Sequence, residues 1–295
     1  MRESTRSQMP DRAPARHRRA SRSRAFAPGI LAGALALAVA AAIVPAEAGA
    51  QGLGTVAPGE WVETDGGRIR LVLGGAAPDG SVEAALDIDL EPGWKTYWLA
   101  PGPSGIPPQI DARRSENLEL VAFDLPAPHH FEDVYGMSTG YKDDVAFPLT
   151  FRVTEPGRPA RLALDGFLGI CEEICIPVPV AFEGEVAQGM STPFDTGRVL
   201  REARLALPIE GAEGALAARL ENDALALDGP ALEGASEVYV APPGSLSLGE
   251  GRGTGTDWRF PVLRGQGEGE AVVIVRKGEG AFARETIHRV AIERR

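Results

Sequence analysis

Hydrophobic and polar residues alternate along much of the chain beyond residue 60, with the period of two that is typical of half-buried β-strands. The clearest example is the range 81–90, in which every second residue from Val82 to Leu90 is apolar and acidic residues lie on the opposite face. Shorter stretches with the same character occur at 61–73, 118–125 and 147–151. Glycine and proline separate these stretches, with 36 and 24 copies in 295 residues. This pattern predicts an all-β fold of the β-sandwich kind.

The range 166–182, GFLGICEEICIPVPVAF, carries the two cysteines of the chain, Cys171 and Cys175. Pro177 and Pro179 exclude a helix, because proline lacks the N–H group that a helix interior needs. The apolar residues on both sides of the cysteines predict two strands, and three intervening residues are a hairpin-length connection. Opposed residues of such a hairpin have Cα atoms about 4.5–5.5 Å apart, which a disulfide can bridge. We interpret the segment as a reversible dithiol/disulfide on a β-scaffold.

The first fifty residues have a different pattern. Arg2 to Arg24 include eight arginines and two acidic residues, the range 30–44 is an apolar run, and Ala48 to Ala50 form a small-x-small cleavage site. Together these features predict a secretory signal peptide at residues 1–50. The apolar run is short for a membrane span of about 20 residues, so we expect cleavage rather than anchoring. Export also places the cysteines where disulfides persist.

The charge of the chain limits its partners. The full sequence has a net charge of −11. Because residues 1–50 hold eight of the 30 basic and three of the 41 acidic residues, the remainder carries a net charge of about −16. Such an acidic surface argues against binding to nucleic acid and to anionic membranes. No later stretch reaches eighteen consecutive apolar residues, so we expect a soluble exported part without direct membrane insertion.

The pattern changes after Phe182, which suggests two β-rich domains in the exported part. We expect a first domain at 51–188, a linker at 189–204 and a second, smaller β-sandwich-like domain at 205–295. A short helix is expected at 199–206. The second domain contains one histidine, no cysteine and no evident cluster of convergent polar residues. We expect it to serve packing or partner docking.

Two further segments carry candidate site residues. Trp94, Tyr97 and Trp98 place three aromatic rings within five residues, either as core aromatics or as a wall beside the cysteine hairpin. The range 126–144 is expected to be a long irregular loop, and loops of this length in a compact domain usually have a function. It holds His129, His130, Phe131, Tyr135, Met137 and Tyr141.

Three motifs in this order resemble the N-terminal periplasmic domain of the DsbD thiol–disulfide interchange family, in particular its ScsB-like branch. They are GWKTYWLAPGPSGIPPQI at 93–110, PAPHHFEDVYGMSTGYKDDVAFPLTF at 126–151 and GICEEICIPV at 169–178. The resemblance covers roughly residues 55–185 and implies an immunoglobulin-like β-sandwich that carries the redox cysteines. It also implies a periplasmic electron carrier, similar to a protein-disulfide reductase, that transfers reducing equivalents to oxidised thioredoxin-like periplasmic oxidoreductases.

The resemblance assigns roles to individual residues. Cys175 would form the mixed disulfide with partners, and Cys171 would resolve it. The segment from Asp133 to Gly136, with Val134 and Tyr135 between them, corresponds to a cap loop that shields the cysteines. Many relatives carry phenylalanine where Val134 stands, so the shielding ring would here be Phe131 or Tyr135.

Relatives in this family continue into a multi-span membrane domain and a thioredoxin domain, whereas this sequence continues into a second β-rich region. We therefore expect the electron donor to be a separate transmembrane protein. The resemblance implies no cofactor and no metal at the site.

The sequence around the cysteines predicts modest thiol reactivity. Glu172 and Glu173 lie between the cysteines, and the range 166–182 contains no Lys, Arg or His. Only the thiolate attacks a disulfide, and neighbouring negative charge disfavours the thiolate. We therefore expect thiol pKa values above the ordinary value.

Alternative functions follow from the same residues. Two cysteines in an exported β-sandwich also suit a purely structural disulfide in a non-catalytic interaction domain, although so small a ring stabilises little. A copper(I) site is a second alternative, because thiolate and thioether ligands prefer that ion. Its ligands would be Cys171, Cys175, His129, His130 and Met137.

Overall fold

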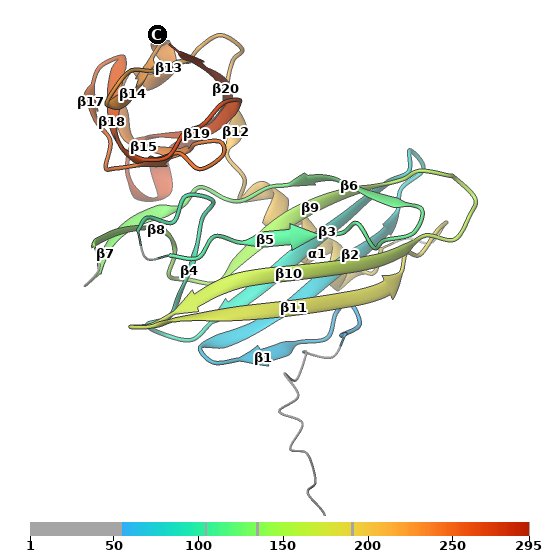
Figure 1. The fold of residues 1–295 in the computed structure, drawn as a ribbon. Helices are drawn as coiled ribbons and strands as arrows, with labels where there is room; N and C mark the ends of the chain where they lie inside the picture. The colour runs from blue at the N-terminus through green and yellow to red at the C-terminus, as the bar shows by residue number, and fades with distance from the viewer. Residues whose placement is uncertain (1–54, 104, 134–135, 190–191, 295) are drawn as a thin grey trace, which may run out of the picture. The chain divides into compact units, whose positions relative to one another are not determined.

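Two antiparallel sheets face each other in the part of the chain that contains the cysteines (Figure 1). The structure is a computed structural model that describes residues 55–103, 105–133, 136–189 and 192–294. The predicted signal peptide at 1–50, and Val134 and Tyr135 of the predicted cap loop, lie outside the described residues. All described residues belong to one compact unit of the chain.

The first sheet has five strands in the order β1-β2-β3-β9-β6. Their bounds are β1 Val62–Thr64, β2 Gly67–Ala76, β3 Ser81–Leu90, β9 Val145–Val153 and β6 Leu118–Phe123. The alternation at 81–90 is strand β3, whose apolar residues from Val82 to Leu90 are buried. Successive side chains of a strand point to opposite faces, so this apolar alternation predicts that one face of β3 lies in the core.

The second sheet carries the cysteines and has the order β11-β10-β4-β8-β7, with β5 paired to β10. Its strands are β4 Lys95–Tyr97, β5 Gln109–Asp111, β7 His129–Asp133, β8 Gly136–Tyr141, β10 Arg161–Cys171 and β11 Cys175–Glu185. Strand β4 therefore lies between the cysteine hairpin and the β7–β8 hairpin (Figure 1).

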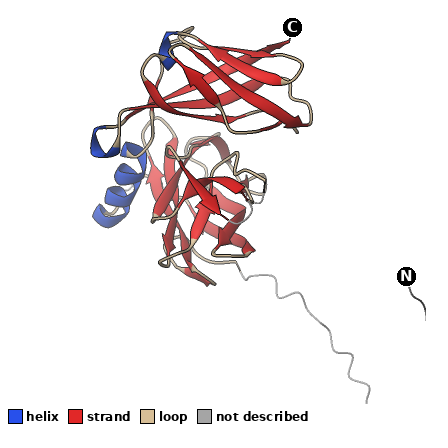
Figure 2. Cartoon of the chain, turned by 90° about the vertical axis from the view of Figure 1, so that its left-hand side faces the viewer, coloured by secondary structure: helices blue, strands red, loops and turns tan. Residues whose placement is uncertain are grey.

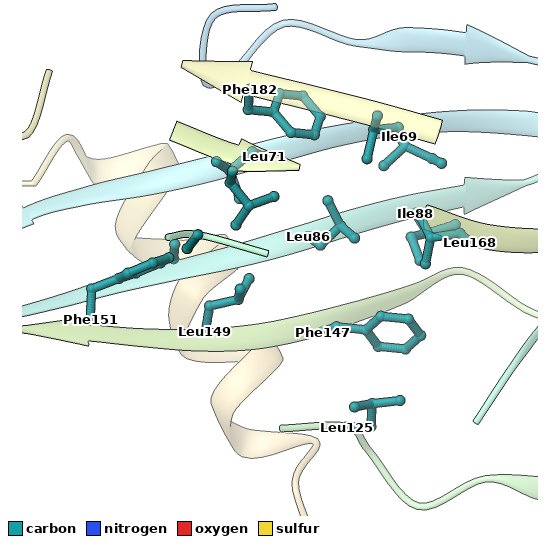
Figure 3. Close-up of a cluster of buried hydrophobic side chains, with 14 of the residues drawn as sticks. Ile69, Leu71, Leu86, Ile88, Leu125, Phe147, Leu149, Phe151, Leu168 and Phe182 are labelled. Atoms are coloured by element: carbon teal, nitrogen blue, oxygen red, sulfur yellow. The ribbon is translucent and has the colours of Figure 1, made fainter. Parts of the chain in front are cut away.

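The main hydrophobic core fills the space between the two sheets (Figure 3). Leu86 and Leu149 from the first sheet and Leu168 and Phe182 from the second are fully buried in it. Each such side chain contributes roughly 1.5–3 kcal/mol by leaving water. The predicted all-β sandwich is confirmed, and its core holds the two strands that carry the cysteines.

The range 126–144 is not the irregular loop that its sequence suggested. Strands β7 and β8 pair in register from His129↔Gly140 to Asp133↔Gly136 and form a hairpin. Gly136 has a φ of +115°, which a glycine adopts readily. The two faces of β7 both meet other parts of the protein, because Phe131 contacts the cysteine cluster and His130 contacts Tyr239. His129, His130 and Glu132 of β7 are exposed, whereas Ser138 to Tyr141 of β8 are all buried, so neither strand has the alternation of apolar and polar residues by which strands are recognised.

Most of the segment expected as a linker, residues 189–204, lies in helix α1, Phe194–Leu205, shown in blue in Figure 2. The expected short helix therefore begins earlier than residue 199. Leu200 and Ala203 pack against Val72 and Ala85 on the outer face of the first sheet. Helix α1 is thus part of the packed structure, although the domain boundaries themselves stay a prediction.

The described residues beyond α1 form a nine-stranded sheet in the order β15-β19-β20-β13-β14-β18-β16, with β12 paired to β20 and β17 to β18. The strands are β12 Ile209–Glu210, β13 Ala217–Leu220, β14 Ala224–Asp228, β15 Ala235–Ala241, β16 Ser247–Leu248, β17 Arg252–Thr254, β18 Asp257–Arg264, β19 Glu270–Lys277 and β20 Arg284–Arg294. Two short 3-10 helices, η1 Pro230–Leu232 and η2 Gly280–Phe282, complete it. The long strand β20 pairs with β19 over most of its length and with β13 at its end, so it joins the two halves of this sheet around a second apolar core. No helix in the described part of the chain is long and apolar enough to span a membrane.

Replacement of Leu149 by alanine tests the core between the two sheets. Leu149 is fully buried, so the change removes buried methyl groups and leaves a cavity, which lowers the free energy of unfolding by about 2–5 kcal/mol. Urea denaturation measures it. Val121, an exposed residue of the same sheet, is the control, and Val121→Ala changes the free energy by no more than about 0.5 kcal/mol. Similar effects of the two substitutions would contradict this core.

Candidate functional site

The cysteine hairpin is formed by β10 and β11, which pair residue for residue from Arg161↔Glu185 to Cys171↔Cys175. The last pair of this ladder is the two cysteines, which form a disulfide with Cα atoms 4.2 Å apart. The hairpin predicted from the range 166–182 is therefore confirmed, with the cysteines opposed at its mouth. The disulfide closes the three-residue tip of the hairpin.

The prolines of β11 fit this hairpin because β11 is the edge strand of its sheet. The carbonyl of Ala181 accepts a hydrogen bond from Val56 on the outer side of β11. In an antiparallel strand the backbone N and O atoms of every second residue point to the same side. Pro177 and Pro179 are two and four residues from Ala181, so their nitrogens also point to the outer side. The pairing with β10 therefore loses no hydrogen bond, and the outer edge near the cysteines offers few donors to an added strand.

The two cysteines differ in exposure. Cys171 is 1% exposed, whereas Cys175 is only partly buried. The tip residues Glu172, Glu173 and Ile174 are exposed, and Ile174 is 75% exposed. An approaching protein can therefore reach the sulfur of Cys175 before that of Cys171.

Strand alternation determines which aromatic residues reach the disulfide. Cys171 is the cross-strand partner of Lys95, so Lys95 and Tyr97 share the face of the cysteines, and their neighbours in sequence face the other way. The hydroxyl of Tyr97 lies 3.2 Å from Sγ of Cys175 and donates a weak hydrogen bond to it. Trp94 and Trp98 belong to the main core between the sheets. Of the expected wall residues, the structure thus brings only Tyr97 to the cysteines.

Gly169 makes room for the Tyr97 ring. A Cβ atom at Gly169 would lie 3.3 Å from Cδ2 of Tyr97 and 2.7 Å from Cβ of Ile106. The second distance is shorter than side chains tolerate, so a larger residue would displace the segment that packs over the hairpin. The glycine just before the cysteine motif therefore has a packing role in the site.

Phe131 lies in the apolar cluster that contains the disulfide. It forms a small cluster with Tyr97, Cys171 and Cys175, and its ring centroid lies 6.4 Å from that of Tyr97. Of the expected cap residues, Phe131 is one that the structure describes in the cysteine cluster, whereas Val134 and Tyr135 lie outside the described residues. Asp133 and Gly136 pair with each other at the end of the β7–β8 hairpin.

Two lysines lie beside this cluster, which the sequence around the cysteines did not reveal. The ammonium group of Lys95 is 5.5 Å from the centroid of the Phe131 ring, and that of Lys142 is 4.8 Å from it. Lys95 is buried, with 8% of its surface exposed. The range 166–182 could not reveal Lys95, because β4 is more than 70 residues away in sequence but adjacent to β10 in the sheet. The expected rise in the thiol pKa values stays a prediction.

The β7–β8 hairpin is anchored by Arg276 of β19. The Arg276 guanidinium donates to the carbonyl of Pro128 at 2.8 Å and to Nδ1 of His129 at 3.2 Å. It also forms ion pairs with Glu237 at 2.6 Å and Glu285 at 2.8 Å, and its side chain is only 7% exposed. Residues 205–295 do contain a convergent polar cluster, contrary to the sequence expectation. Its members are spread over three strands, so no local motif marks it.

His130 contacts Tyr239 on the other face of the same hairpin, although part of its side chain is exposed to solvent. Its ring centroid lies 4.5 Å from that of Tyr239, and its Nδ1 lies 3.0 Å from the hydroxyl of Thr139. Burial lowers the pKa of His130 below its ordinary value, because desolvation disfavours the charged imidazole. The neutral ring is therefore the form that the folded protein favours.

The contacts of the two histidines do not favour the copper alternative. His129 lies against Arg276 and His130 against Tyr239, whereas the cysteines are joined to each other. Among the residues that the structure describes, no group of three or more His, Cys, Asp or Glu side chains is placed to hold a metal ion.

Comparisons with known proteins agree with this geometry. Residues 71–185 match the family described as thiol:disulfide interchange protein DsbD, N-terminal. The crystal structure of the N-terminal periplasmic domain of ScsB from Proteus mirabilis is similar, with a TM-score of 0.59 and 20% identity, over 78% of this chain and 97% of that one. The reduced DsbD N-terminal domain from Neisseria meningitidis has a TM-score of 0.28 and 19% identity, over 42% of this chain and 87% of that one. No curated protein sequence matches the chain.

Reduction of the disulfide should leave the protein folded. The ring that the disulfide closes spans a sequence separation of 4, and the chain-entropy model gives about 2 kcal/mol for so short a ring. Urea denaturation with and without dithiothreitol should show cooperative unfolding in both cases, with the free energy lowered by about 2 kcal/mol or less. Loss of cooperative unfolding on reduction would instead identify the disulfide as a structural requirement.

Acidification should destabilise the protein through His130. Its pKa is lowered in the folded state, while the unfolded chain keeps an ordinary value of about 6.5. The unfolded state therefore binds more protons as the pH falls through that value, and stability decreases. Denaturation midpoints between about pH 7 and pH 5 should fall less steeply in His130→Gln than in the unsubstituted protein. Burial also lowers the pKa of His288, so the variant His288→Gln measures how much His288 contributes to the loss of stability. If stability falls with pH as steeply in His130→Gln as in the unsubstituted protein, His130 is not responsible.

Proposed function

This chain contains a DsbD N-terminal-like thiol–disulfide interchange domain at residues 71–185, and we propose that it is an electron carrier of the periplasm. In this proposal the reduced Cys171–Cys175 pair passes two electrons to oxidised thioredoxin-like oxidoreductases. A separate transmembrane protein reduces the pair again. The protein would thus act like a protein-disulfide reductase that is itself regenerated.

The observation that carries the proposal is the unequal exposure of two opposed cysteines. Cys175 is partly exposed at the mouth of an edge hairpin, and Cys171 is buried beside it. A partner's disulfide can approach Cys175, while Cys171 stays within bonding distance of Cys175. This supports Cys175 as the attacking residue and Cys171 as the resolving residue.

The reaction proceeds in two exchanges. The Cys175 thiolate attacks one sulfur of the partner's disulfide, which forms a mixed disulfide and releases the partner's other sulfur as a thiolate. The Cys171 thiolate then attacks Sγ of Cys175, which forms the Cys171–Cys175 bond and releases the second partner thiolate. The two protons that the cysteines lose are balanced by the two that the partner's thiolates take up. The carrier is oxidised by two electrons and the partner is reduced by two.

The β7–β8 hairpin would control access in this cycle. Phe131 belongs to one apolar cluster with Tyr97 and the two cysteines, which supports the shielding role expected of this segment. We propose that the segment from Asp133 to Gly136, with Val134 and Tyr135, shields the cysteines until a partner docks. The anchor at Arg276 holds the other end of β7 in place.

The periplasmic location rests on two supports. The first is the pattern of residues 1–50, which predicts a signal peptide. The second is the similar structure from ScsB, which is itself a periplasmic domain. The acidic charge beyond residue 50 further favours partners whose contact face is basic.

A trapping experiment tests the proposed function. In Cys171→Ser the resolving sulfur is absent, so the mixed disulfide between Cys175 and an oxidised thioredoxin-like oxidoreductase of the periplasm should persist. A non-reducing gel should show a one-to-one complex that dithiothreitol dissolves. The matched control, Cys175→Ser, retains only the buried sulfur and should form little complex. Equal complexes from both variants, or none from either, would contradict the proposal.

A further inference from the structure

Ile174 lies at the tip of the cysteine hairpin, directly before Cys175, and the reaction described above does not use it. We propose that Ile174 is an apolar anchor for the partner oxidoreductase, and that Glu172 and Glu173 beside it select a partner with a basic contact face. The partner is a thioredoxin-like oxidoreductase with an apolar recess beside its disulfide and basic side chains around that recess. The inference rests on the proposed function and deepens it, because it names the surface that recognises the partner.

The core of the sandwich does not account for Ile174. Ile170 on one side of the tip is fully buried, and Ile176 on the other side packs against the same core. Ile174 lies between them in the chain, yet 75% of it is exposed. Turns favour Gly, Pro, Asn, Asp and Ser, which Ile174 is not. Neither packing nor turn chemistry therefore requires an isoleucine at this position.

The position of Ile174, more than its exposure, marks it as a contact residue. Single exposed apolar side chains are common on protein surfaces, and Ile209 of β12 is 74% exposed. Ile174, however, precedes Cys175, and consecutive Cα atoms lie about 3.8 Å apart. Even a small protein interface covers roughly 500 Å² of each partner. A protein that forms a mixed disulfide with Cys175 therefore covers Ile174 as well.

Burial of Ile174 by the partner favours docking, because apolar surface leaves water. The ladder of β10 and β11 holds the tip as far as the pair Ile170↔Ile176. Few further residues are ordered on binding, and a preorganised surface loses less entropy when a partner docks. Apolar anchors contribute most when they fill a recess of the partner. The fitting partner therefore has an apolar recess next to its own disulfide.

The charges around the site favour basic side chains on the partner. The described charged residues on the segments that form the site are mostly acidic and exposed. They are Glu91 before β4, Glu132 on β7, Lys142, Asp143 and Asp144 after β8, and Glu172 and Glu173 at the tip, together with the buried Lys95 on β4. Complementary charge accelerates association and disfavours partners of the wrong sign. The two tip glutamates adjoin the anchor itself, so they act on the rim of the recess.

The test compares a large and a small disulfide substrate with the reduced full chain. The large one is the oxidised thioredoxin-like oxidoreductase of the trapping experiment, and the small one is glutathione disulfide, which covers little of the tip. Acid quenching and thiol alkylation measure both rate constants. In Ile174→Ser the ratio of the oxidoreductase rate constant to the glutathione rate constant should fall about tenfold or more.

Two further variants serve as controls for this ratio. Ile174→Leu keeps an apolar side chain of similar volume and should retain the ratio within about threefold. Ile209→Ser removes an equally exposed isoleucine from the region beyond α1, and the ratio should equal that of the unsubstituted chain.

Salt dependence tests the two glutamates. The rate constant for the oxidoreductase should fall as the salt concentration rises from about 0.01 to 0.15 M, because salt screens exposed charges. In the double variant Glu172→Gln/Glu173→Gln this fall should shrink by about half or more. The double variant Glu213→Gln/Glu233→Gln removes two exposed acidic charges beyond α1 and should retain most of the salt dependence.

Two results would overturn the inference and leave the proposed function standing. One is the same ratio of rate constants in Ile174→Ser as in Ile209→Ser. The other is the same salt dependence in the two double variants. In both cases the unsubstituted chain still reduces the oxidoreductase. If the unsubstituted chain reduces glutathione disulfide but not the thioredoxin-like oxidoreductase, the proposed function fails and the inference fails with it.

Discussion

The residue-for-residue pairing of β10 with β11 is the constraint on which the site depends. This ladder runs without an irregularity through eleven pairs and ends at Cys171 and Cys175. Its inner face, from Leu162 to Ile170, is buried in the main core, which holds the hairpin rigidly. An inserted residue in either strand would turn one cysteine to the opposite face of the sheet.

The neighbours of the hairpin give the two sulfurs different environments. Strand β4 brings Lys95 to Cys171 and the hydroxyl of Tyr97 to Cys175, while Phe131 from β7 covers the pair. Strand β7 is in turn held by Arg276, a buried cation with carboxylate partners and a backbone carbonyl. A buried ion pair is costly to break, because either partner alone would be an uncompensated charge. The region beyond α1 thus contacts the strand that carries Phe131 of the cysteine cluster, which gives it a structural connection to the site.

Much of this structure could be predicted from local patterns. The alternation at 81–90 corresponds to β3 with the same bounds, and the cysteine spacing with its flanking prolines identified the hairpin. Prediction failed for β7 and β8, whose sequences lack an alternation of apolar and polar residues, since both faces of β8 are buried and β7 has one buried apolar side chain, Phe131. The sequence left open whether Trp94, Tyr97 and Trp98 lie in the core or beside the cysteines, and the structure places the two tryptophans with the core and Tyr97 with the cysteines. Arg276 and Lys95 were missed because their partners lie on distant segments.

The sequence alone determined that the chain forms β-strands, that two of them meet in a hairpin and that the hairpin brings two cysteines together. These features depend on residues close in sequence, whose periodicity and turn chemistry act locally. Only the tertiary structure decided which sulfur is exposed, which rings and charges surround the pair, and which cation anchors the covering hairpin. Those properties depend on strand order within the sheets, since neighbours such as Lys95 and Cys171 are brought together by pairing between distant strands. The chemistry of the site therefore follows from strand order as much as from its two cysteines.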